Sequence, residues 1–125
     1  MERKDITTLI SHFIPNEQVY HVEFPERILH KYNGRDNLDN TIEELLYVIL
    51  YPLLENEIEY NFKLEWNTEH SNAWFYFINI RLTVNGNKFE PELLIKTLQD
   101  HNMDEGLLLK KESSYGQFET IFKSG

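Results

Sequence analysis

Residues 57–66, with the sequence EIEYNFKLEW, and residues 74–84, with the sequence WFYFINIRLTV, decide the fold. In both segments apolar and polar side chains alternate, which is the period of a β-strand with one buried side. In the second segment, Phe75 and Phe77 make the other side partly apolar as well. The two segments follow one another along the chain, so they predict a central antiparallel hairpin over about residues 57–84 with its even-numbered side chains buried.

The register of this hairpin follows from its aromatic residues and charges. Placing Trp66 opposite Trp74 leaves residues 67–73 as the connection. The same register puts Glu59 opposite Arg81, a favourable cross-strand pair. We therefore expect this pairing between the two strands.

A helix precedes the hairpin. Asn40 or Thr41 starts it, and apolar residues follow at helical spacing. This stripe consists of Ile42, Leu45, Leu46, Ile49, Leu50 and Leu53. Pro52 has no N–H to donate to the carbonyl of Val48, so the helix is expected to kink or end near Tyr51.

The remaining segments carry shorter patterns bounded by turn residues such as Asn85-Gly86 and Pro91. They predict strands over residues 19–24, 107–110 and 117–123, and helices over residues 5–13, 25–32 and 91–101. Helices and strands are interspersed, but the longest strands are sequential. The expected fold is therefore α+β, with a mostly antiparallel sheet packed by helices on one face.

Size and composition favour one globular domain over residues 1–125. The chain is 41% apolar, with eight Phe, seven Tyr and two Trp, which is enough to fill one core. It has no cysteine, and its N-terminus lacks a signal-peptide core, so a cytoplasmic location is expected. The longest uncharged apolar run, residues 45–54, is far shorter than the about 20 residues that cross a bilayer. No membrane association is predicted.

Negative charge is concentrated in one quarter of the chain. Residues 36–69 hold nine acidic residues and one basic residue. They therefore carry nearly all of the net charge of the chain, which is −9. A field of one sign attracts a basic partner and raises its association rate. It also disfavours direct nucleic-acid binding, which requires clustered Lys and Arg.

Chemical signatures are missing from the sequence. The five histidines are scattered, without the spacing that presents two imidazoles to one metal, and are expected to be isolated surface or helix-end groups. The glycines never cluster into a phosphate-binding loop, and no serine has a nucleophile setting. We expect no enzyme activity, no catalytic residues, no metal and no cofactor.

The candidate binding surface combines tyrosines with acids. Glu43, Tyr47 and Tyr51 recur every fourth residue on the predicted helix, and the acids continue onto the following strand. Aromatic anchors with surrounding charge are typical of protein-binding surfaces. Alternatively, the tyrosines fill core space and reach water only with their hydroxyl groups. The proposed contact set is Glu43, Glu44, Tyr47, Tyr51, Glu55, Glu57, Glu59 and Glu65.

The sequence therefore predicts a non-enzymatic intracellular binding protein whose acidic face engages a basic protein, such as a toxin, in the manner of an immunity or antitoxin-type inhibitor. A different class stays open, namely a small-molecule or nucleotide-binding domain with an aromatic-lined apolar pocket. Salt separates the two, because steering by charge weakens with ionic strength and an apolar pocket hardly responds. The oligomeric state is not determined, although an exposed edge strand offers a route to a homodimer.

Overall fold

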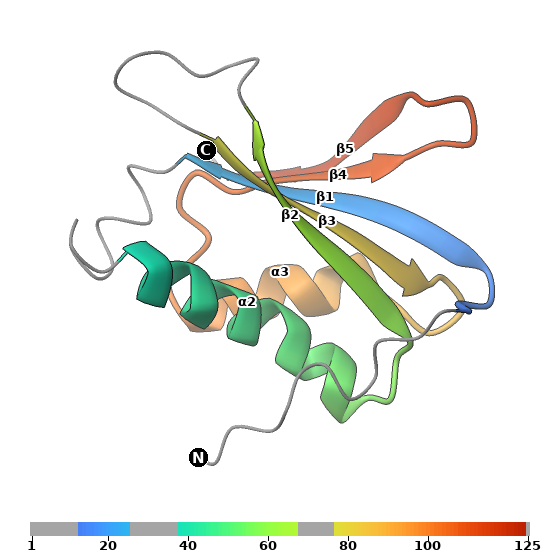
Figure 1. Ribbon diagram of the computed structural model, residues 1–125, viewed down its shortest axis with the longest axis horizontal. Coiled ribbons are helices and arrows are strands. Elements are labelled where there is room, and N and C mark those ends of the chain that lie inside the picture. The colour runs from blue at the N-terminus through green and yellow to red at the C-terminus, as the bar shows by residue number, and fades with distance from the viewer. Residues whose placement is uncertain (1–12, 26–37, 68–76, 125) are drawn as a thin grey trace.

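The computed structural model describes residues 13–25, 38–67 and 77–124, and these residues form one antiparallel sheet and two helices (Figure 1). The strands are β1 (Glu17–Pro25), β2 (Tyr60–Asn67), β3 (Phe77–Asn85), β4 (Leu108–Glu112) and β5 (Phe118–Lys123), and the helices are α2 (Leu38–Glu55) and α3 (Pro91–Asp100). The strand order is β2-β3-β1-β4-β5, with every neighbouring pair antiparallel.

Helices α2 and α3 lie together on one side of the sheet (Figure 1). We call them the helical layer. The core fills the space between this layer and the sheet, and its central members are Phe24, Leu45, Leu50, Tyr60, Ile80, Leu82, Leu98 and Leu109. The expected fold, an α+β sheet packed by helices on one face, is confirmed. Neither helix of the described residues is long and apolar enough to span a membrane.

The prediction of which side chains of the central hairpin are buried is confirmed, but the predicted pairing register of its two strands is wrong. Ile58, Tyr60 and Ile78 point into the core as expected, but Trp66 lies opposite Ile78, four residues beyond Trp74. A shift by an even number of residues leaves the same side chains buried, so the alternation of the sequence does not distinguish the two registers. Residues 74–76 lie outside the described part.

The predicted pairing of Glu59 with Arg81 is also wrong, because Lys63 takes the place opposite Arg81. The Glu59 carbonyl instead accepts a hydrogen bond from the Asn85 backbone N–H, at 3.1 Å. The Asn85 side-chain amide donates to the Glu59 carboxylate at 2.9 Å. One surface ion pair contributes only about 0.2–1 kcal/mol, less than this anchoring of a buried asparagine.

Helix α2 continues through Pro52 to Glu55, so of the two predicted alternatives, a kink or an end near Tyr51, the end is wrong. The proline removes one helical hydrogen bond, but its own carbonyl still accepts the Asn56 backbone N–H at 3.1 Å and the Asn56 side chain at 2.7 Å. Leu53 is fully buried in the last turn. Burial of this apolar turn offsets the lost bond, and the chain reverses only after Glu55.

Strand β1, helix α3 and the β4–β5 hairpin agree with the predicted elements. At the turn between β3 and α3, the Gly86 N–H donates to the carbonyl of Asn16 at 2.9 Å. A Cβ atom at Gly86 would come within 2.5 Å of the Gln18 side chain, so any other residue here would require that side chain to shift. Pro25 is the last residue of β1, and the predicted helices over residues 5–13 and 25–32 otherwise fall almost wholly outside the described residues.

Candidate partner-binding groove

The sheet separates the predicted contact residues into two groups. Glu43, Tyr47, Tyr51 and Glu55 follow one stripe of α2, on the helical layer. Glu44 is half-buried on the same helix, and Glu57 lies in the turn after it, with a positive φ of 54°. Glu59 and Glu65 belong instead to the opposite side of the sheet, because Ile58, Tyr60 and Leu64 beside them pack into the core. The eight residues do not form one continuous face.

The α2 stripe borders a groove between the two helices, which we call the α2–α3 groove. Its volume is about 350 Å³, and its lining includes Tyr47, Val48, Tyr51, Pro52 and Glu55 from α2 and Leu93, Thr97 and His101 from α3 and its end. The two tyrosine rings lie 5.2 Å apart at an angle of 30°. Both tyrosines are half-buried, so each contributes to the packing and still presents part of its ring to the groove.

The polar groups of the α3 wall are largely bonded within α3. Thr97 donates its hydroxyl to the Leu93 carbonyl at 2.7 Å. His101 Nδ1 donates to the Thr97 carbonyl at 2.8 Å. On the α2 wall, by contrast, the exposed Glu55 side chain has no hydrogen bond or ion pair with any described residue. The groove therefore offers an apolar and aromatic surface with an available carboxylate at its edge.

Charge in the helical layer is mostly negative. The two helices contain six acidic residues and one basic residue, Lys96. Helix α2 contains no Lys or Arg at all. The acidic residues of α2 therefore have no cation on their own helix to offset their charge.

The other side of the sheet carries a polar network that the sequence did not reveal. We call this side the helix-free face, because neither helix of the described residues lies on it (Figure 1). It is defined by His21, Glu23, Lys63, Glu65, Asn79, Arg81, Lys110 and Glu112. His21 and Asn79 are only 9% and 8% exposed. The prediction that the histidines are surface or helix-end groups is therefore wrong for His21.

His21 is held through both ring nitrogens. The Asn79 side-chain amide lies 3.0 Å from Nδ1, and a Glu112 carboxylate oxygen lies 3.2 Å from Nε2. Because the amide N–H can only donate, Nδ1 accepts and Nε2 carries the proton that is donated to Glu112. The Phe118 ring packs edge-on against the imidazole at 4.9 Å. This arrangement orients the imidazole.

The charges of the helix-free face are matched in pairs. Arg81 lies 3.8 Å from Glu112, and Lys110 lies 3.4 Å from Glu23. Lys63 lies 3.8 Å from Glu65 on the same strand. Alternation along each strand could have assigned these residues to one face, but only the order of the strands brings the opposite charges together.

Glu59 is engaged in the same manner at the end of β2. Its carboxylate accepts the Asn85 amide, and Lys88 Nζ lies 3.3 Å from it. The hydrogen bond from Asn85, followed by smaller contributions that include the Lys88 charge, lowers the pKa of Glu59 from its ordinary value of 4.5. This residue has a structural role in anchoring the turn between β3 and α3.

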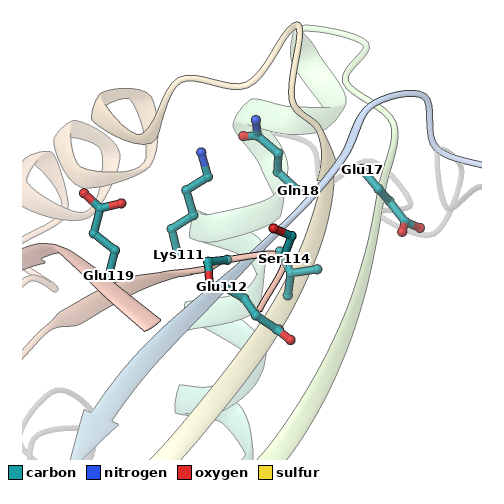
Figure 2. Close-up of a pocket in the computed structure, with 8 residues that line it drawn as sticks. Glu17, Gln18, Lys111, Glu112, Ser114 and Glu119 are labelled. Atoms are coloured by element: carbon teal, nitrogen blue, oxygen red, sulfur yellow. The ribbon is translucent and has the colours of Figure 1, made fainter. Parts of the chain in front are cut away.

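A second cavity of about 470 Å³ lies where β1 meets the β4–β5 hairpin (Figure 2). Figure 2 shows Gln18 and Lys111 pointing to one side of the sheet and Glu112 to the other. Its charged groups therefore do not converge on one point. In the part of the chain that the structure describes, no three histidine or acidic side chains are arranged to hold a metal ion.

Comparison with known proteins found no matching family model, no similar curated protein and no similar solved structure.

Proposed function

We propose that the protein is a non-enzymatic binding protein that captures a basic protein partner at the α2–α3 groove, in the manner of an immunity or antitoxin-type inhibitor. The observation that carries this proposal is the combination of two adjacent, tilted tyrosine rings with an acidic stripe that has no Lys or Arg on its helix. A cytoplasmic toxin with a positively charged active surface is the kind of partner that fits such a groove.

The tyrosines and the acids have different roles in this proposal. Tyr47 and Tyr51 act as rigid aromatic anchors, because aromatic residues in partly desolvated pockets dominate binding energy. A Lys or Arg of the partner would lie against these rings and contact Glu55. Glu43 and Glu44 contribute mainly to long-range attraction, which sets the association rate.

The helix-free face is the weaker choice for this site. Its described acids Glu23, Glu65 and Glu112 already have cations within 4 Å. A basic partner would have to displace these cations, and the displaced charges would then repel it. Glu59 and Glu65 are therefore removed from the proposed contact set, and the groove residues remain.

The test measures association and dissociation rates with a basic protein captured at low salt and then purified. Reversing Glu43 and Glu55 together to Lys should slow association at least about tenfold and flatten its salt dependence. Tyr51→Ala should mainly speed dissociation, by about 30-fold for a loss of about 2 kcal/mol.

The matched control is the double reversal of Glu17 and Glu119 to Lys, since both residues are exposed and lie away from the groove. It changes the net charge by the same amount. If the control slows association as much as the groove variant, the whole-protein field acts and the groove does not. If Tyr51→Ala leaves both rates unchanged in a folded protein, the proposal is wrong.

A small-molecule or nucleotide site is the second candidate, and the aromatic lining of the groove favours it. The volume of about 350 Å³ lies at the small end of ligand pockets. A ligand of this class would copurify or bind with an affinity that hardly depends on salt, and Tyr51→Ala would weaken it whereas the reversal of Glu43 and Glu55 would not.

A further inference from the structure

Strand β2 forms one edge of the sheet, because the strand order places it next to β3 only. No described strand pairs with its outer side. The edge is eight residues long, contains no proline and pairs with β3 without a register shift. Natural sheets usually protect such an edge, so a regular one is a candidate for pairing with another chain.

The hydrogen bond at the end of β2 determines which backbone groups point outward. The Glu59 carbonyl accepts from Asn85 and therefore faces β3. In an antiparallel strand the N–H and C=O of one residue point to the same side, and this side alternates from residue to residue. The backbone N–H and C=O groups of Lys63 and Glu65 thus also point toward β3. The backbone groups of Phe62 and Leu64 point the other way, out from the edge of the sheet.

The sequence of this edge is self-complementary. Residues 61–67 read NFKLEWN, so Leu64 is a centre of symmetry with Lys63 and Glu65 on either side of it, an aromatic residue at each next position and an asparagine at each end. In an antiparallel pair of two such strands centred on Leu64, Lys63 of each copy lies opposite Glu65 of the other. Residue 62 lies opposite residue 66.

The hydrogen-bond pattern is compatible with this register. The Leu64 backbone groups of the two copies would bond to each other across the twofold axis, because both point outward. Lys63 and Glu65 would then form the non-hydrogen-bonded pairs, in which facing residues are closest, with Cα atoms about 4.5 Å apart. Opposite charges at directly facing positions stabilise a sheet.

The surroundings of Lys63 within its own chain also favour an oppositely charged residue from a second chain across the β2 edge. In its own sheet it lies opposite Arg81, which has the same charge, and its side chain is 74% exposed. Its contact with Glu65 is 3.8 Å. On the opposite side of β2, Phe62 and Leu64 pack against the core but remain partly exposed. A second strand would cover both residues.

We propose that β2 is a self-association edge, and that two copies of the chain join their sheets through antiparallel β2 strands centred on Leu64. The contact is isologous, which closes the assembly at two copies and leaves no free β2 edge. The α2–α3 groove is not part of this contact, so the inference does not depend on the proposed function.

Sedimentation equilibrium over micromolar to millimolar concentrations tests the proposal. The wild-type chain should dimerise, whereas Lys63→Glu and Glu65→Lys should each raise the dimer dissociation constant about tenfold or more, because like charges then face each other twice. An equimolar mixture of the two single variants should form a heterodimer, since every facing pair is again opposite. The double variant carrying both changes should recover the homodimer.

A melting curve of each variant separates this effect from damage to the fold. Lys63→Glu places an acid opposite Arg81 but removes the contact with Glu65, so the isolated chain should be about as stable as wild type while it loses dimerisation. A wild-type chain that stays monomeric throughout the concentration range would overturn the proposal. So would single variants that dimerise as well as wild type, or a mixture that does not associate.

Discussion

The outer surface of the helical layer and the helix-free face of the sheet both carry many charged residues, but they hold them in different states. On the helix-free face, Glu23, Glu65 and Glu112 each have a cation within 4 Å. On the helical layer, Glu55 has no such partner among the described residues. An acid with a nearby cation stabilises the packing of the strands, whereas an acid without one adds to the long-range electrostatic field.

This difference changes the interpretation of the acidic segment over residues 36–69. Glu59 and Glu65 belong to it by sequence, yet Lys88 and Lys63 offset their charge in the structure. The acids of α2 are not offset in this way by any basic residue of their own helix. The contrast is therefore between Glu59 and Glu65, which have a cation close by, and Glu55, which has none among the described residues. Three experiments can break or sharpen this distinction.

The largest effect should come from placing charge on the core side of β3. Ile80 is fully buried, whereas Thr83, three residues away, is half-buried on the helix-free face. Ile80→Asp should destabilise the protein by about 4 kcal/mol or more, because an unpaired carboxylate enters the core. Thr83→Asp should cost about 1 kcal/mol. Urea denaturation followed by circular dichroism measures both, and equal losses would contradict the assignment of faces.

An intermediate effect is expected from removing one glutamate on each surface. Glu112→Ala should lower the free energy of unfolding by about 1–3 kcal/mol, since the N–H of a buried His21 loses its acceptor and Arg81 loses its ion-pair partner. Glu55→Ala should change it by less than about 0.5 kcal/mol, since Glu55 is exposed. Chemical denaturation of the two variants side by side provides the comparison. A similar loss in both would mean that the helical-layer acid is also structural.

The smallest effect concerns the ionisation of Glu59. An NMR titration of its carboxyl carbon should give a pKa below 4.5, and Asn85→Ala should raise it more than Lys88→Met, because the Asn85 hydrogen bond is the main cause of the shift. A lowered pKa means that the stabilisation is fully present above pH 4.5 and is lost as the pH falls through the pKa of the folded protein. An ordinary pKa for Glu59 would place it among the freely solvated acids.

The candidate site was predictable only in part. Tyr47 and Tyr51 could be assigned to one stripe of a helix because both lie one turn apart, and the structure places them side by side at a groove. The opposite wall, with Leu93 and Thr97, could not be predicted, because it comes from a helix about 40 residues later in the chain. The hydrogen bonds of His21 could not be predicted for the same reason, since the residues involved lie on β1, β3 and β4.

The sequence by itself determined the type and the faces of most described elements, because the periods of two and 3.6 residues depend only on local geometry. It did not determine the register of β2 on β3, since every even shift buries the same side chains. Nor did it determine the continuation of α2 through Pro52, where burial of Leu53 outweighs one lost hydrogen bond. These features depend on contacts between segments distant in sequence, and only the tertiary structure decides which acids are matched by a cation and which remain open to a partner.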